Sequence, residues 1–235
     1  MGIDEISKQK GHKDFVTVVS DLEAGELIEV IDSHQQEDIV EALMQQPLEV
    51  REAVEEVSVD MWGGFPAVIK EVFPNAEIVV DRFHVMKAVN KNLNEIRKQI
   101  KFKVKVKGVK WLLLKNQNDL NDDEQEKLES VLKQSKRLRK AHELKEDFRD
   151  IYENSKERDI GKNKFEGWLQ KAQSIYTDAV KTVRNHLDTI CNYFLSRTTS
   201  GVMEGINNRL KLIKRQAYGF MNFENMRRRF LSCFS

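Results

Sequence analysis

A βαβ unit is the feature that most constrains how this chain can fold, and it occupies residues 57–85, VSVDMWGGFPAVIKEVFPNAEIVVDRFHV. In it an apolar strand ends at Asp60, a helix follows the Gly-Gly pair, and a second apolar strand ends at Asp81. Such units are right-handed and gather ligands at the carboxyl ends of their strands, where both aspartates lie. The same aspartates are also suited to capping the helices that follow, and the spacing alone does not separate the two roles.

Three short strands and a helix precede this unit. Alternating apolar residues with turn-rich connections predict an antiparallel meander of strands over residues 3–7, 15–20 and 27–31. A helix is predicted over 35–46, ending before Pro47. The resulting order, β-β-β-α-β-α-β, predicts a mixed α/β sheet with helices on its faces. Asp4, on the first strand, can meet Asp60 only if the first and fourth strands are neighbours.

From residue 85 the pattern is helical. Helices are predicted over 85–102, 106–116, 122–153, 163–176 and 178–196, with breaks at Gly108, 116–119, Gly161 and Gly167. The charged stretch 123–153 is typical of a solvated helical hairpin or coiled-coil arm and shows no catalytic constellation. Trp111 and Trp168 are predicted core anchors between helices.

The closing segment, residues 197–235, begins with a Ser/Thr cluster and a helix predicted over 201–216. At 100° per residue one face carries Val202, Ile206, Leu210, Ile213 and Ala217, and the opposite face carries Glu204, Asn208, Lys211 and Arg215. One carboxylate, one amide and two cations in a stripe suit a helix whose acid binds a metal while its cations hold phosphates. A plain amphipathic surface helix remains the alternative.

Composition fits a globular protein of one or two domains and excludes membrane-spanning and collagen-like chains. The start of the chain lacks the apolar core of a signal peptide, so a cytoplasmic location is expected. The two cysteines, Cys191 and Cys233, offer neither a disulfide framework nor metal-ligand spacing.

The formal net charge of +1 conceals an uneven distribution along the chain. The number of basic residues (Lys and Arg) and the number of acidic residues (Asp and Glu) are 5 and 19 in residues 1–81, 11 and 1 in 82–118, 15 and 16 in 119–196, and 8 and 2 in 197–235. Two basic blocks are either solvated helix faces or the footprint of a phosphate backbone. The candidate DNA contacts in them are Lys101, Lys103, Lys105, Lys107, Asn208, Lys211, Lys214 and Arg215.

Phosphoryl transfer on DNA uses two divalent ions about 4 Å apart, and hard Mg²⁺ ions prefer carboxylate oxygens. Asp4, Asp60 and Glu204 meet that requirement if the first and fourth strands are adjacent and the last long helix packs beside them. Asp81 and His84 form a DxxH pair after the fifth strand. That pair either orients a scissile phosphate or has a structural role.

Several segments resemble the catalytic region of bacterial insertion-sequence transposases of the ISL-three group. The similarity covers nearly the whole chain, and its most specific pieces are DRFHV at 81–85 and EGINNRLKLIKRQAYGF at 204–220. The resemblance implies a ribonuclease H-like fold, a DDE triad of Asp4, Asp60 and Glu204, and two Mg²⁺ or Mn²⁺ ions. Asp81 and His84 then have a supporting role, although Asp81 is also strongly patterned and leaves the choice of second acid open.

The resemblance also implies a domain organisation. A ribonuclease H-like core formed by 1–88 and 197–235 would be interrupted by a helical insertion over 89–196. It further implies a cut-and-paste DNA transposase that acts as a homo-oligomer on insertion-sequence ends, associated with the bacterial nucleoid in the cytoplasm and not with a membrane.

The sequence departs from the family at its start, three residues before Asp4. Full-length members carry an N-terminal zinc-binding segment and a helix-turn-helix, so the resemblance predicts a truncated chain or an inactive remnant. Without that module, DNA binding would rest on phosphates and depend strongly on salt. Two other functions stay open: a non-catalytic DNA-binding protein that retains the fold, and another ribonuclease H-like nuclease.

Overall fold

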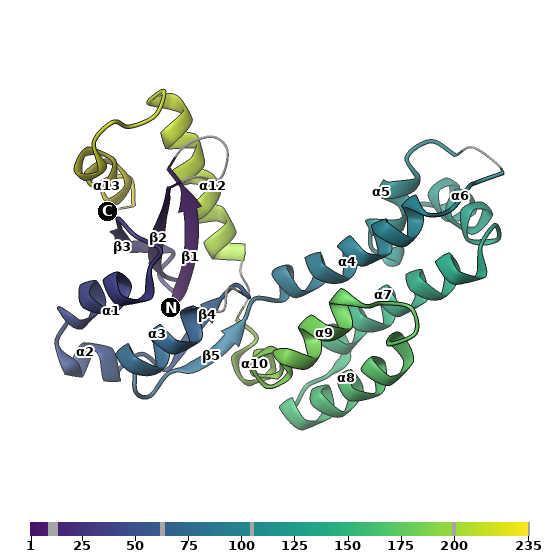
Figure 1. Ribbon diagram of the computed structural model, residues 1–235, viewed down its shortest axis with the longest axis horizontal. Helices are drawn as coiled ribbons and strands as arrows, with labels where there is room; N and C mark the ends of the chain where they lie inside the picture. The colour runs from purple at the N-terminus through teal and green to yellow at the C-terminus, as the bar shows by residue number, and fades with distance from the viewer. Residues whose placement is uncertain (9–13, 62–63, 104–105, 199–200, 235) are drawn as a thin grey trace. The chain divides into compact units, whose positions relative to one another are not determined.

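The computed structural model describes residues 1–8, 14–61, 64–103, 106–198 and 201–234. The chain divides into two compact units, Met1–Asp81 with Arg197–Ser235, and Arg82–Ser196. The first unit carries the sheet, and the described part of the second is helical (Figure 1). Each unit is described by itself.

The sheet has five strands in the order β3-β2-β1-β4-β5. Their bounds are β1 Gly2–Ser7, β2 Phe15–Asp21, β3 Glu26–Ile31, β4 Glu56–Val59 and β5 Glu77–Val80. The first three strands pair antiparallel, as the meander predicts, whereas β1 pairs with β4 and β4 with β5 in parallel. The predicted mixed α/β sheet and the adjacency of the first and fourth strands are therefore confirmed.

Five helices accompany the sheet in the described part of this unit. They are α1 Gln36–Met44, α2 Leu48–Glu52, α3 Phe65–Val72, α12 Gly201–Gln216 and α13 Phe223–Leu231. The prediction missed α2, which is five residues long and has no buried residue, so it leaves no apolar period in the sequence. The bounds predicted for the last long helix, 201–216, are confirmed.

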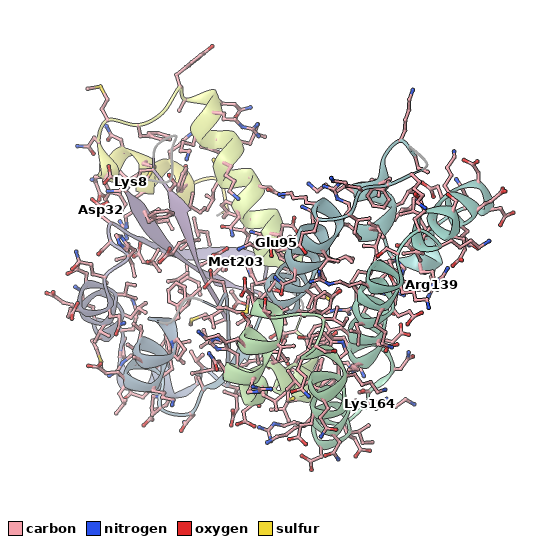
Figure 2. The ribbon with its side chains drawn as sticks, turned by 45° about the vertical axis from the view of Figure 1, so that its right-hand side comes forward. Lys8, Asp32, Glu95, Arg139, Lys164 and Met203 are labelled. Atoms are coloured by element: carbon pink, nitrogen blue, oxygen red, sulfur yellow. The ribbon has the colours of Figure 1, made fainter. Side chains whose placement is uncertain are left out.

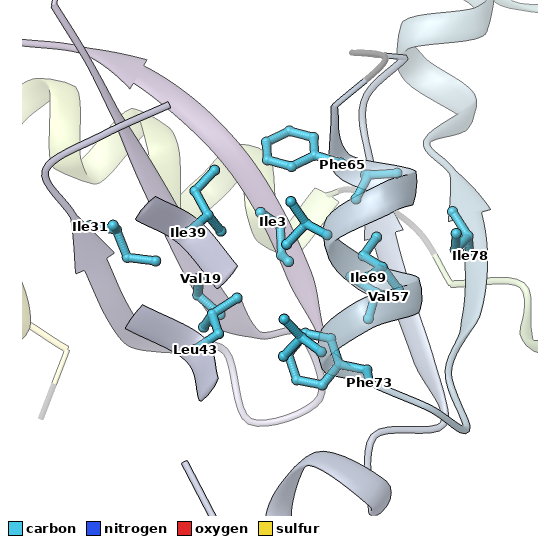
Figure 3. Packing of buried hydrophobic residues seen from close by; sticks show 13 residues of the cluster. Ile3, Val19, Ile31, Ile39, Leu43, Val57, Phe65, Ile69, Phe73 and Ile78 are labelled. Carbon is cyan, nitrogen blue, oxygen red and sulfur yellow. The ribbon is translucent and has the colours of Figure 1, made fainter. Parts of the chain in front are cut away.

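One face of the sheet packs against α1 and α3. Strand alternation turns Ile3, Val57 and Val59 to this side, where they meet Ile39 of α1 and Ile69 of α3 (Figure 3). All of these side chains are buried. This apolar layer anchors the βαβ unit to the meander.

The opposite face packs against α12 and α13. Side chains of β1, β2 and β3 form one apolar cluster with residues of the two helices: Ile6, Val16, Val18, Leu27, Val30, Ile206, Leu210, Ile213, Met226 and Phe230. Arg227 of α13 forms two hydrogen bonds with Glu29 of β3, at 2.7 and 2.6 Å. Lys8 and Asp32 form an ion pair just beyond β1 and β3 (Figure 2). The closing segment is thus built into the sheet unit.

The described helices of the second unit are α4 Arg82–Lys98, α5 Val109–Leu114, η1 Gln117–Asp119, α6 Asp122–Leu132, α7 Lys136–Asn154, α8 Arg158–Ala172, α9 Asp178–Asn185, α10 Leu187–Cys191 and α11 Tyr193–Ser196. In its centre α7 packs against α4 and α8. Phe148, Tyr152 and Phe165 form an aromatic core there, with ring centroids 5.0–5.7 Å apart. No helix within the described ranges has the length and apolarity needed to cross a membrane.

The prediction of a solvated arm over 123–153 is wrong for its second half. The stretch forms two helices, and α7 buries ten residues, among them His142, Lys145 and Glu146. The Lys145 ammonium donates to the carbonyls of Leu113 and Lys115 at 3.2 and 2.8 Å and pairs with Glu146. Because Lys145 is hydrogen-bonded and ion-paired inside the fold, the composition of the stretch gave a misleading picture of its exposure.

Two further sequence expectations need correction. Trp168 is buried and donates from its indole nitrogen to the Leu144 carbonyl at 2.7 Å, but Trp111 is 67% exposed and is not a core anchor. Gly161 and Gly167 lie inside α8 and do not break it. The packing at Gly161 requires a glycine, since an added Cβ would lie 2.1 Å from the Phe194 ring.

We predict opposite effects of two alanine substitutions within α8. Gly161→Ala forces the Phe194 ring to move and should lower the free energy of unfolding by about 1–3 kcal/mol. Gly167→Ala is the matched control, because nothing lies within 4 Å of an added Cβ, and it should raise stability by up to about 1 kcal/mol. Urea denaturation measures both, and equal effects would contradict the proposed packing.

We also predict an acid-labile contribution from His142. Burial, reinforced by the charge of Lys145, lowers the pKa of His142 from 6.5 to about 4. Between these values the unfolded chain binds more protons than the folded one, so stability should fall as the pH drops, by a total of about 3 kcal/mol. His142→Gln should flatten the pH dependence of the melting temperature between pH 6.5 and 4, and an unchanged slope would refute the assignment.

Candidate active site

Asp4 lies in the middle of β1, opposite Val18 of β2. The alternation of the strand turns it to the face that α12 covers, while Ile3 and Glu5 face the other side. One carboxylate oxygen, Oδ1, accepts the Glu5 backbone N–H at 2.7 Å. The other, Oδ2, accepts a hydrogen bond from the side-chain amide of Asn207 at 2.5 Å. Asp4 is thus held from its own strand and from a helix some two hundred residues away.

Asp60 follows β4 directly, and the strand register places it level with Asp4. Gly2 pairs with Ser58 and Ile3 with Val59, so Asp4 and Asp60 are the next residues along the two adjacent strands. Neighbouring strands lie about 4.8 Å apart, which brings the two backbones into close proximity. The electrostatics of Glu5 are consistent with this proximity. Burial first, and then the carboxylates of Asp60 and Asp4, raise the pKa of Glu5.

Helix α12 runs alongside β1 in the same direction (Figure 1). Three contacts join them. Met203, labelled in Figure 2, lies against Gly2 and accepts a hydrogen bond from Ser20 on its sulfur at 3.4 Å. Asn207 reaches Asp4, and the Lys214 ammonium donates to the Ser7 carbonyl at 2.5 Å. The spacing of these contacts is the same on both elements. The eleven residues of helix from Met203 to Lys214 and the five residues of strand from Gly2 to Ser7 each span about 16.5 Å.

The contacts of α12 with β1 determine which side of the helix carries Glu204. The flank with Ile206 and Ile213 packs towards β2 and β3 in the shared apolar cluster. The predicted polar stripe of Glu204, Asn208, Lys211 and Arg215 lies on the other flank of the helix, away from that cluster. All four residues are exposed. The carboxylate of Glu204 is therefore on the flank of α12 that is not packed in the apolar cluster.

The predicted faces of α12 are right in part. Ile206, Leu210 and Ile213 are buried, whereas Val202 and Ala217 are exposed. Met203 and Asn207 are buried instead, because the helix is rotated so that its line of contact with β1 passes through them. The apolar pattern of the sequence did not predict the burial of Asn207, because this residue is polar. Two adjacent asparagines in GINN were the only available sequence signal.

The residues fit a divalent cation in donor chemistry, with two carboxylates on adjacent strands in a region of surplus negative charge. The third acid does not complete a cage: within the described residues, no group of three His, Cys, Asp or Glu side chains is arranged to hold a metal ion. Glu204 is exposed on α12. The fold therefore places Asp4 and Asp60 level with each other on adjacent strands. It places Glu204 about one helical turn before Asn207 on α12.

Asp81 lies level with Asp60, because Val80 of β5 pairs with Val59 of β4 and each aspartate is the next residue along its strand. Asp81 is buried, and its N–H donates to the Val59 carbonyl at 2.8 Å. His84 belongs to α4, where its ring stacks edge-on to that of Phe83 at 5.6 Å.

The predicted cations differ in their surroundings. Lys101, Lys103 and Lys107 are exposed in the helical unit, and Lys105 lies outside the described residues. The Lys214 ammonium donates a hydrogen bond to the Ser7 carbonyl. Burial first, and then the charge of Lys211, lowers the pKa of Lys214.

Comparison with known proteins identifies relatives along almost the entire chain. The family model for DDE transposases of the ISL3 (ISL-three) group, described as "Transposase", matches residues 1–230. The transposase for insertion sequence element IS1001 of Bordetella parapertussis is 24% identical over 237 residues, which is 95% of this chain and 58% of that protein. The transposase for IS1557 of Mycobacterium tuberculosis is 25% identical over 256 residues, covering 94% and 56%.

This chain therefore spans little more than half the length of the curated relatives it matches. Its match to the family model extends from the first strand through α13, so it includes the sheet, the helical unit and the helix that carries Glu204. The chain belongs to the ISL3 group of DDE transposases.

Proposed function

We propose that this chain is the ribonuclease H-like catalytic core of a DNA transposase, which cleaves and joins DNA at insertion-sequence ends. The observation that carries the proposal is the level placement of Asp4 and Asp60 on adjacent parallel strands, under a helix whose exposed flank presents Glu204. Family membership supports transposition as the overall activity.

In this proposal Asp4, Asp60 and Glu204 hold two Mg²⁺ or Mn²⁺ ions. When bound, these ions activate the attacking oxygen and stabilise the leaving oxygen of a phosphodiester. The rigid sheet fixes the first two carboxylates, while α12 must bring the third, whose side chain is exposed in this structure. Asp81 and His84 would support the site from the end of β5 and the start of α4.

We assign DNA contact to the exposed cations near these acids. Asn208, Lys211 and Arg215 share the flank of α12 that carries Glu204, and residues 205–223 contain no acid. A cationic stripe beside a carboxylate site would hold the phosphates of the strand being cut. Lys214 instead anchors α12 to β1 through Ser7. The exposed Lys101, Lys103 and Lys107 would add a second basic surface on the helical unit.

We propose that the insertion predicted over 89–196 lies within the helical unit, Arg82–Ser196, since the sheet unit contains residues from both sides of it. Its aromatic core gives it internal contacts of its own. We further propose that the protein acts in the bacterial cytoplasm, bound to DNA at the nucleoid, as a homo-oligomer that pairs two element ends.

A non-catalytic DNA-binding protein is the second candidate. It is favoured by the position of Glu204, which does not join Asp4 and Asp60 in a metal-holding group among the described residues. Such a protein would keep the cations of α12 but would not cleave DNA. A cleavage and strand-transfer assay on element-end DNA separates the two functions, with the segments present in longer relatives supplied.

The metal assignment predicts that Asp60→Asn and Glu204→Gln each weaken Mn²⁺ binding by at least about tenfold, because each removes a ligand charge. Calorimetric titration of the purified chain measures the affinity. Glu41→Gln is the matched control, because Glu41 is an exposed acid of α1 on the opposite side of the sheet. Unchanged binding in both active-site variants would eliminate this ligand set.

The DNA assignment predicts that Lys211→Ala and Arg215→Ala each weaken binding to duplexes of any sequence and reduce the slope of log affinity against log salt by about 1. Filter binding over a salt series gives both quantities. The control is Lys70→Ala, an exposed lysine of α3 on the opposite face. If the control loses as much affinity as the two variants, the stripe is not the contact surface.

A further inference from the structure

The buried amide of Asn207 is the least expected group beside the candidate active site. Its side chain is 6% exposed and lies on the face of α12 that packs on the sheet, between Met203 and Leu210. An apolar residue at this position would extend the packed face without burying a polar group. The helix therefore carries a polar group where stability alone favours leucine.

Only half of this amide is satisfied within the described residues. Its nitrogen donates to Asp4 Oδ2 at 2.5 Å, whereas its oxygen, Oδ1, is buried and has no hydrogen-bond partner among the described residues. A buried acceptor left without a donor costs about 1–3 kcal/mol. A purely structural amide would be expected to use both ends, so packing alone does not account for this amide, whose nitrogen is committed to Asp4.

We propose that Asn207 is a positioning residue for Asp4. This inference rests on the proposed function, in which Asp4 is a metal ligand. The amide holds Oδ2 and so fixes the rotamer of the carboxylate, and it does so without a charge. A lysine or arginine in its place would neutralise Asp4 and compete with a divalent cation, and an aspartate would repel it.

The same hydrogen bond sets the height of Glu204 relative to Asp4. Glu204 lies three residues before Asn207 on α12, so fixing Asn207 at the level of Asp4 also fixes where the third acid stands along β1. Met203 against Gly2 and Lys214 on Ser7 hold the helix on either side of this contact. The helix should therefore stay docked when Asn207 is replaced, which separates positioning from folding.

The experiment compares Mn²⁺ affinity and thermal stability in the purified chain, with Mn²⁺ as the only ligand. Asn207→Leu should keep the melting temperature of the metal-free protein or raise it, yet weaken Mn²⁺ binding about 10- to 100-fold, as loss of a residue that orients a ligand typically does. Asn207→Ala serves if the leucine does not fit. Asn92→Leu is the matched control, since it removes a buried amide from the helical unit and should leave Mn²⁺ affinity unchanged.

Asp4→Asn separates the two possible failures. If Asp4→Asn abolishes Mn²⁺ binding and both Asn207 variants bind like the wild type, the role of Asn207 is refuted while the metal site stands. If Asp4→Asn binds like the wild type, or the wild type does not bind Mn²⁺, the proposed function itself fails. Equal losses in Asn92→Leu and Asn207→Leu would mean that affinity follows general destabilisation, which also overturns the inference.

Discussion

The parallel pairing of β1 with β4 is the interaction on which the rest of the sheet unit depends. It joins the N-terminal meander to the βαβ unit, and it places Asp4 and Asp60 side by side at the same height. The apolar layer of Ile3, Val57 and Val59 against α1 and α3 holds that pairing from one face. A shift by one residue would turn the acids to opposite faces of the sheet, so the register and the chemistry are linked.

The other face depends on α12, which arrives from a part of the chain more than a hundred residues after β5. Its docking has two components with different consequences. Ile206, Leu210 and Ile213 supply apolar burial, which is non-directional, whereas Asn207 and Lys214 form hydrogen bonds to β1 that fix the position along the strand. The intervening helices have an aromatic core of their own around Phe148.

The sequence predicted the sheet, the order of its elements and the last long helix, because strand alternation and helical periodicity are local signals. It failed where burial overrides composition. The charged stretch 123–153 contains a buried helix, α7, in which Lys145 and Glu146 form an ion pair, and Trp111 is exposed despite its size. For the candidate site, the pattern singled out Asp4, Asp60 and Glu204, which stay predictions, but not Asn207, since a buried amide looks like a surface residue until its partner across the fold is known.

We propose that Asp4 and Asp60, with Glu204 brought in by α12, hold divalent metal ions. This metal site can be tested with a crystal structure of the chain grown with Mn²⁺ and measured at the manganese absorption edge. We expect an anomalous peak within coordination distance of the Asp4 and Asp60 carboxylates, with Glu204 turned towards it. Manganese bound only elsewhere, with these carboxylates free of metal, would refute the proposed site.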